Sequence, residues 1–352
     1  MANYDIFDEQ YYLSQYPGLK TAIDRGIIKS GKDHFERFGQ TAGLTKVSRY
    51  FDESNYLAKY PQIAALIRTP ANPNLPFASG LDHFIQYGYE QGRTEVSPEY
   101  DEAFYLANNR DLLPFIQNGS FKNGYQHFIK FGSKESRFGT SFFEPTYLFN
   151  NPDLSQAISS GILKTGREHY FKYGQFETGR KATFVGTSGN DILTSFGVGN
   201  VELIGVEVGL ASTNSSLRGQ IYESDGSQEF DTLIGGSGRD KFVLADVLLN
   251  SRAFVVGTAN LYIGEGFATI RNFTKGQDSI QLPGNSFDQF LVFPINNNRD
   301  LAIQTNGLPV PTNIGFGVEI SSFDTIAIIE GGGNLSLNVL SQSPSLGTLL
   351  VG

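Results

Sequence analysis

The feature that most constrains the fold of this 352-residue chain is a block of about 44 residues that recurs four times in its first half. Each block opens with an aromatic and an acidic residue, continues into a Tyr-Leu pair, and closes with Gly-x-x-His followed by an aromatic residue. A block of this length cannot bury its apolar face alone, so the repetition predicts short helices stacked into an array. The closing signatures contain all four histidines of the chain: His34, His83, His127 and His169.

Each block is predicted to contain two or three short helices. An Asp-Glu pair such as Asp8-Glu9 opens the first helix, and a proline such as Pro17 ends it. A middle helix over Leu19 to Arg25, followed by Gly26, completes the unit. The last helix has good N-caps, with an acidic or amide residue three positions later that resembles a capping box. These N-caps are Ser30, Ser79, Asn123 and Thr165.

The end of that last helix carries a glycine and two aromatic residues. We expect the aromatic pair, Phe35 and Phe38 in the first copy, to face inward. The glycines stand where a helix-ending residue in the left-handed conformation belongs. These glycines are Gly39, Gly88, Gly132 and Gly174.

The repeated histidines have two interpretations. Histidine is the commonest metal ligand, so they could form a metal or proton-transfer cluster. Equivalent positions in a stacked array lie on the order of 10 Å or more apart, however, which favours a structural ring that packs between aromatics and donates a hydrogen bond to the backbone. Arg93, Arg137 and Arg180 also recur, and we expect each to pair with an acidic residue of the next copy. A surface for a partner is the alternative.

Charge separates the two halves of the chain. Residues 1–182 contain 20 Lys and Arg against 20 Asp and Glu, whereas residues 183–352 contain 7 against 16, so the whole net charge of -9 lies in the second half. This distribution argues against a nucleic-acid partner and is compatible with a hard cation. The chain has no cysteine, which excludes disulfides and thiolate metal sites. It has no run of 18 apolar residues and no leader-like start, so neither a transmembrane helix nor a cleaved signal is expected.

The second half contains glycine-rich nonapeptides. Gly235 to Val243 fits the pattern G-G-x-G-x-D-x-U-x in full, Gly186 to Thr194 resembles it, and Gly226 to Ile234 fits the same frame with two glycines lost. The spacing predicts a parallel β-roll, in which glycine-rich turns alternate with short strands. The apolar residues expected to point inward are Leu193, Leu233 and Phe242.

Carboxylate and carbonyl oxygens suit calcium. The predicted metal-binding residues are therefore Asp191, Asp231 and Asp240, with Gly236 and Gly238. The alternative is a degenerate roll in which the aspartates cap turns without a metal.

These motifs resemble the repeats-in-toxin (RTX, haemolysin-type calcium-binding) family over roughly residues 184–340. Residues 268–282 are similar to the strand–turn–strand segment that follows the roll in that family, and residues 323–331 to its final strand pair. The helical blocks resemble tandem modules that accompany such domains. The resemblance implies bound Ca²⁺ and type I secretion through an uncleaved C-terminal signal. The tail, which has no Lys or Arg after Arg299, is typical of such a signal.

The sequence thus predicts an α+β multidomain protein. Residues 1–182 form four helical repeats (about 5–50, 51–99, 100–142 and 143–182), and residues 183–352 form an all-β, β-roll-like domain. The chain contains no H-E-x-x-H, G-x-S-x-G or phosphate-loop motif, so we expect no enzyme activity.

The leading hypothesis for function is a secreted, calcium-binding structural or interaction protein. It would assemble as a homo-oligomer or polymer at the cell surface, or in an extracellular matrix or filament. One alternative is an adhesin that binds cell-surface polysaccharide through exposed Tyr and Phe. Another is an intracellular scaffold protein with a degenerate roll.

Overall fold

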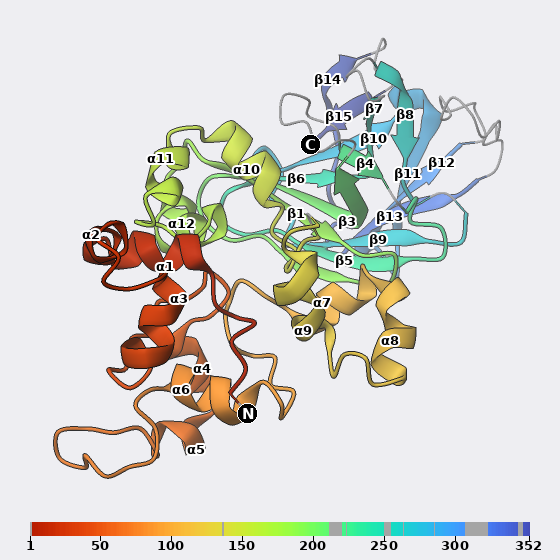
Figure 1. Cartoon of the computed structure of the whole chain (residues 1–352). Coiled ribbons are helices and arrows are strands. Elements are labelled where there is room, and N and C mark those ends of the chain that lie inside the picture. Colours follow the sequence, from red (N-terminus) through yellow and green to blue (C-terminus); the bar gives the residue numbers. More distant parts are fainter. Residues whose placement is uncertain are drawn as a thin grey trace. The chain divides into compact units, whose positions relative to one another are not determined.

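A computed structural model describes residues 2–135, 137–210, 220–222, 224–249, 255–262, 264–284, 286–306, 323–343 and 348–352. The first part of the chain is helical and the second is built from strands, so the protein is α+β, as predicted (Figure 1). Two compact units are present: residues 1–140 with 153–168, and residues 141–152 with 169–352. Among the described residues, no helix is long and apolar enough to cross a membrane.

Each of the first three copies contributes three helical segments, and the fourth contributes four. The first copy contains α1 (Glu9–Gln15), α2 (Gly18–Asp24) and α3 (Gly31–His34), which runs into the π-helical η1 (Phe35–Gly39). The second contains α4 (Glu53–Lys59), α5 (Pro61–Ala64), α6 (Gly80–His83) and η2 (Phe84–Gly88). The third contains α7 (Glu102–Ala107), η3 (Arg110–Leu112), α8 (Leu113–Gln117), α9 (Gly124–His127) and η4 (Phe128–Gly132). The fourth contains α10 (Glu144–Asn150), α11 (Leu154–Ser159), α12 (Gly166–Lys172) and η5 (Gly174–Phe176).

The predicted N-caps begin the last helices, and the aspartate of the Asp-Glu pair caps the first helix. Asp8 accepts a hydrogen bond from the Tyr11 N–H at the start of α1, and the Ser30 hydroxyl accepts one from the Asp33 N–H at the start of α3. The resemblance to a capping box is wrong in detail. The side chain three residues after the N-cap accepts from the backbone N–H of the residue before the N-cap, and not from that of the N-cap itself. In the second copy, Asp82 accepts from the N–H of Ala78, the residue before the N-cap.

The ends of the last helices differ from the prediction. Gly39, Gly88 and Gly132 lie inside π-helical turns, Gly174 lies in η5, and none has a positive φ. The expectation that both aromatics of the pair face inward is wrong for the second one. Phe35 is 0% exposed, whereas Phe38 is 49% exposed. The same split holds for Phe84 and Tyr87, Phe128 and Phe131, and Tyr170 and Tyr173.

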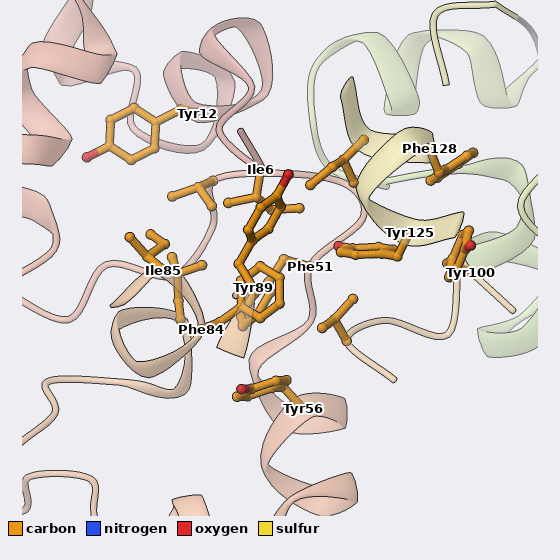
Figure 2. Close-up of a cluster of buried hydrophobic side chains, with 14 of the residues drawn as sticks. Ile6, Tyr12, Phe51, Tyr56, Phe84, Ile85, Tyr89, Tyr100, Tyr125 and Phe128 are labelled. Atoms are coloured by element: carbon orange, nitrogen blue, oxygen red, sulfur yellow. The ribbon is translucent and has the colours of Figure 1, made fainter. Parts of the chain in front are cut away.

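Aromatic side chains dominate the core of the first unit. Buried residues from the first three copies pack into one cluster (Figure 2). Within it, the ring of Tyr100 lies 5.0 Å from those of Tyr125 and Phe128, in tilted and edge-to-face contacts that aromatic quadrupoles favour. The repeated aromatics therefore serve mainly to build a shared interior.

The described strands of the second unit form two large sheets and one two-stranded sheet. One contains, in order, β1 (Lys181–Gly186), β3 (Asn200–Leu210), β6 (Arg239–Val243), β10 (Ser279–Pro283), β15 (Thr348–Val351) and β14 (Val339–Ser343), with β4 (Gln220–Tyr222) paired to β3. The other contains β11 (Phe290–Ile295), β12 (Asp300–Thr305), β13 (Thr325–Ile329), β9 (Phe267–Arg271), β5 (Phe230–Ile234) and β2 (Ile192–Thr194). A hairpin of β7 (Ala245–Leu249) and β8 (Val255–Asn260) and the short η6 (Phe287–Gln289) complete the described elements.

Apart from β4, which pairs with β3, and the β7–β8 pair, which belongs to neither sheet, the strands from β1 to β10 alternate between these two sheets. Strands β1, β3, β6 and β10 pair in parallel in one sheet, and β2, β5 and β9 pair in parallel in the other. Leu193, Leu233 and Phe242 are buried, as predicted. The prediction of a strand pair over residues 323–331 is wrong, because that segment contains the single strand β13 and the last antiparallel pair is β14 with β15.

Candidate functional site

Each repeated histidine contacts the tyrosine of its own copy. The tyrosine Oη and histidine Nδ1 are 2.9 Å apart for Tyr12–His34 and Tyr56–His83, and 2.8 Å apart for Tyr105–His127 and Tyr147–His169. Burial lowers the pKa of His83 to about 4 and raises that of the Tyr56 hydroxyl, so the phenol donates to a neutral ring. The predicted packing against aromatics is confirmed, for example by Phe77 and Tyr87 around His83. The predicted backbone partner is not found at Nδ1, which accepts from a tyrosine hydroxyl instead.

The repeated glycine after the aromatic pair makes room for this contact. A Cβ on Gly88 would lie 2.5 Å from Tyr56 Oη, and one on Gly39 would lie 2.7 Å from Tyr12 Oη. A Cβ on Gly132 or Gly174 would lie still closer to the hydroxyl of Tyr105 or Tyr147. The glycine is therefore required by close approach of the hydroxyl, and not by a left-handed backbone as the sequence suggested.

The recurring Asp-Glu pairs have a structural role, in line with the sequence interpretation. The aspartate caps its own helix, and the glutamate reaches the start of the last helix of the same copy. Glu53 Oε1 accepts from the Gly80 N–H at 2.6 Å, and Oε2 accepts from the Leu81 N–H at 3.0 Å. Glu9 and Glu102 make the same pair of bonds. A carboxylate at a helix N-terminus is stabilised by the exposed N–H groups and the helix dipole.

The expectation that the arginines pair with the next copy is wrong. Arg137 donates to Asn109 at 2.7 Å and to Asp111 at 3.0 Å, both in its own copy. Arg180 donates to Asn151, again in its own copy. Arg93 stacks 4.3 Å over the ring of Tyr60, which occupies the position equivalent to Asn109. In each of these copies the arginine therefore contacts the residue one helical turn after the buried tyrosine, by a hydrogen bond where it is asparagine and by stacking where it is tyrosine.

The predicted calcium residues lie in turns of the second unit. Asp191 Oδ2 accepts from the Thr187 N–H at 2.7 Å, and Asp240 Oδ2 accepts from the Gly236 N–H at 2.7 Å, each four residues back. The other oxygen of Asp240 accepts from the Ser195 hydroxyl. Asp231 differs, because its oxygens accept from the Asp191 N–H and the Tyr262 hydroxyl. These carboxylates link each turn to its neighbour.

Gly236 and Gly238 lie where neighbouring turns approach closely. A Cβ on Gly236 would lie 3.1 Å from the Ser195 carbonyl oxygen, and one on Gly238 would overlap the Gly199 carbonyl. Side chains at these positions would push the two turns apart.

Sequence reasoning missed two acidic residues beside the predicted ones. Asp278 repeats the Asp240 geometry: it accepts from the N–H of Thr274, four residues back, and from the Asp240 N–H. The signal was its place in the Gly276-x-Asp278 segment after the roll. Glu229 occupies a position where the nonapeptide has glycine, and its Oε2 is buried with no hydrogen-bond partner among the described atoms.

Buried and half-buried carboxyl groups gather around these turns. Burial, together with the charge of nearby carboxylates, raises the pKa of Asp231 to about 6 and that of Glu229 to about 8. Burial also raises the pKa of Asp191, Asp240 and Asp278. A cation placed here would relieve a real electrostatic cost.

The donor chemistry fits calcium, but the described side chains do not form a complete cage. In the part of the chain that the structure describes, no three His, Cys, Asp or Glu side chains are grouped so that they could hold a metal ion. Calcium takes six to eight oxygens, so an ion here would need backbone carbonyls in addition to carboxylates. Glu229 Oε2, which is buried without a hydrogen-bond partner among the described atoms, is the carboxylate oxygen left free to bind an ion.

Comparison with known proteins adds little. No protein-family model matches the chain, and no curated protein matches it. The solution structure of the AlgE6R3 subunit from the Azotobacter vinelandii mannuronan C5-epimerase is similar at 15% sequence identity, over 42% of this chain and 70% of that chain, with a TM-score of 0.15. A TM-score this low carries no argument about fold or function.

Proposed function

We propose that the chain is a structural and interaction protein that associates with copies of itself. The observation that supports this most is that the residues shared by the copies bind one another inside the protein. The tyrosine, histidine, glycine and glutamate of a copy bind one another across its helices, as Tyr56, His83, Gly88 and Glu53 do. Side chains engaged in this way stabilise a scaffold, and its surface then provides the function.

Concentration-dependent particle size tests this proposal. Sedimentation or light scattering of the purified chain, with calcium and with a chelator, is expected to show larger species as the protein concentration rises. A chain that stays monomeric in both conditions would contradict it.

We also propose that the second unit is an RTX-type β-roll that takes up calcium. The alternation of β1, β2, β3, β5 and β6 between two sheets supports the roll. Asp191, Asp231 and Asp240, with carbonyls near Gly236 and Gly238, would hold the ion. Its positive charge would stabilise the buried carboxylates, so binding free energy would add to folding free energy. Calorimetric titration with Ca²⁺, with Mg²⁺ as control, tests this proposal.

Secretion by a type I system remains part of the proposal. The tail that would carry the signal includes β14 and β15, and β15 pairs with β10. Deleting the last 50 residues would therefore damage the sheet as well as any signal. A better test appends residues 303–352 to a reporter and measures its export with and without the transporter.

A second candidate function is polysaccharide binding. One surface aromatic recurs in every copy beside the histidine: Phe38, Tyr87, Phe131 and Tyr173, between 47% and 54% exposed. Exposed rings of this kind can stack on sugars. Pull-down on polysaccharide beads, comparing the natural chain with Tyr87→Ala, tests this candidate.

A further inference from the structure

One segment of the fourth copy belongs to a different unit from the residues on either side of it. Residues 153–168 pack with residues 1–140, whereas residues 141–152 and 169–352 form the other unit. The chain thus leaves the first unit at residue 140 and returns once. We call residues 153–168 the returning segment.

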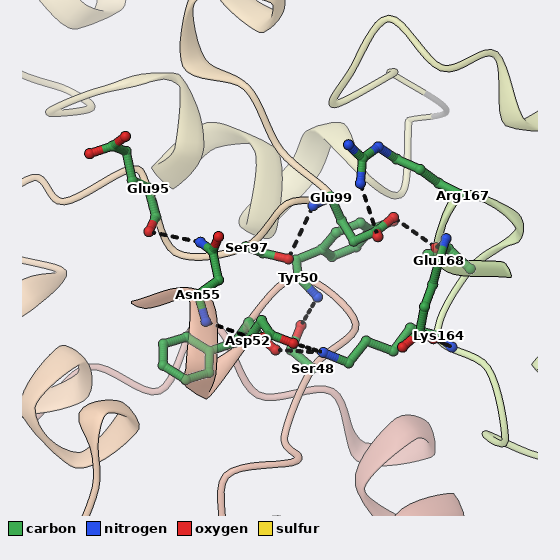
Figure 3. Close-up of polar contacts among 12 residues, drawn as sticks. Ser48, Tyr50, Asp52, Asn55, Glu95, Ser97, Glu99, Lys164, Arg167 and Glu168 are labelled. Atoms are coloured by element: carbon green, nitrogen blue, oxygen red, sulfur yellow. Dashed lines mark hydrogen bonds and ion pairs between the residues drawn. The ribbon is translucent and has the colours of Figure 1, made fainter. Parts of the chain in front are cut away.

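The returning segment is held to the earlier copies by charged groups. Lys164 Nζ lies 2.8 Å from Asp52 Oδ2, with both side chains largely shielded from solvent (Figure 3). Thr165 donates to Glu99 Oε2 at 2.7 Å, and Arg167 pairs with Oε1 of the same carboxylate at 3.4 Å. The Glu99 side chain is only 6% exposed. A buried carboxylate is costly without a partner, so these contacts make docking specific.

Backbone acceptors of the turn at Gly161 complete the docking. Gln15 donates to the Gly161 carbonyl at 2.6 Å, and Arg49 donates to the carbonyls of Ile158 and Lys164. Gly161 has φ +74, and a Cβ there would meet the Ser14 and Gln15 side chains. The equivalent glycines Gly26 and Gly119 share this left-handed backbone, yet a Cβ on either would meet nothing within 4 Å. Among these three, only the turn of the fourth copy is docked.

We infer that the returning segment exchanges between two copies of this chain, so that the segment of each molecule docks on residues 1–140 of the other. The contacts join residues 66 to 146 positions apart, and a single connection after residue 140 links the docking surface to the rest of the chain. Opening that connection allows the same contacts to form between molecules without any new surface, which is a low-cost route to dimers. The inference rests on the proposed self-association and names its partner and surface.

In the closed form the returning segment docks on its own molecule, and in the exchanged form it docks on a second copy. Protein concentration sets the proportion of the two forms. Both contain the same ion pairs and hydrogen bonds, so the balance is set by the chain concentration against the effective concentration of the tethered segment. Dimers are therefore expected to increase with protein concentration and to be indifferent to calcium.

Disulfide trapping tests the exchange directly, because the natural chain has no cysteine. A Cβ at Gly161 would lie 3.0 Å from the Ser14 Cβ, close to the range of disulfides. One sample of Ser14→Cys and another of Gly161→Cys, differently tagged, are mixed at high concentration and oxidised. The expected result is a covalent heterodimer. The matched control replaces Gly161→Cys with Gly26→Cys, which has the same backbone conformation and no neighbour, and should give none above background.

A chain carrying both Ser14→Cys and Gly161→Cys reports on docking itself. If its disulfide forms within monomers while the mixed single variants never cross-link, the exchange is overturned. If neither disulfide forms, the docking is overturned as well. If particles grow with concentration without any cross-link, self-association stands and the exchange falls.

Charge reversal provides a second test that avoids the glycine. Lys164→Glu places like charges together in a closed chain, and so does Asp52→Lys. An exchanged heterodimer of these two variants restores one Glu–Lys pair and one natural Lys–Asp pair. Mixing them should therefore raise the dimer fraction several-fold over either variant alone. A mixture whose mass distribution equals the average of its components would overturn the exchange.

Discussion

Removing one hydroxyl, by Tyr56→Phe, tests the role assigned to the repeated histidines. Tyr56 is 0% and His83 is 4% exposed, and no solvent can replace the 2.9 Å contact between them. The change leaves the buried Nδ1 of His83 without its donor and removes no carbon. Leaving one buried polar atom unsatisfied costs about 1–3 kcal/mol. With a urea dependence of about 2 kcal/mol per molar, the unfolding midpoint of the helical unit should fall by roughly 1 M.

Urea titration followed by circular dichroism at 222 nm measures this shift. Tyr12→Phe is the matched control, because it removes the same hydroxyl from the part-buried pair with His34, where water can take its place. The control should therefore cost less than half as much. Equal midpoints for Tyr56→Phe and the natural chain would refute the reasoning, and so would a larger loss in the control.

Three further predictions follow from the same structure. Gly88→Ala should destabilise the helical unit by about 1–3 kcal/mol because its Cβ meets Tyr56 Oη, whereas Gly18→Ala, with nothing within 4 Å, should be neutral or slightly stabilising in the same titration. The folded-state pKa of His83 lies below its unfolded value, so up to about 3 kcal/mol of the stability present above pH 6.5 should be lost as the pH falls toward about 4. A plot of unfolding free energy against pH should lack this part of its slope in His83→Gln. An unchanged slope in that variant would contradict the assignment. Calcium should raise the melting temperature of the natural chain more than that of Asp231→Asn; equal shifts would count against Asp231 as a ligand.

Local features were predictable because they depend on neighbours in the sequence. The N-caps at Ser30 and Asp8 need only the next three residues, and the middle helix α2 ends before its left-handed Gly26 as predicted. Leu233 and Phe242 are buried because each follows a turn at a fixed spacing.

Features that depend on packing were not predictable. The partner of His83 is 27 residues upstream, and only the arrangement of α4 against α6 brings Tyr56 to it. The same contact explains Gly88, which local reasoning assigned to backbone conformation. The docking of Lys164 on Asp52 spans 112 residues, and no local pattern in the sequence indicates a contact over that separation.

At the β turns, the pattern located Asp231 and Asp240, which are buried, but not the groups that they contact. Asp231 contacts the Tyr262 hydroxyl, which comes from outside every nonapeptide. Asp278 repeats the geometry of Asp240 without the full motif, because one carboxylate and the N–H four residues back suffice to close the turn.

The central claim is that this chain is a scaffold that associates with itself. Sedimentation velocity of the natural chain over a wide concentration range, in calcium and in chelator, tests it most directly. The proportion of dimers or larger species is expected to rise with concentration. A single monomeric species at every concentration in both conditions would contradict it.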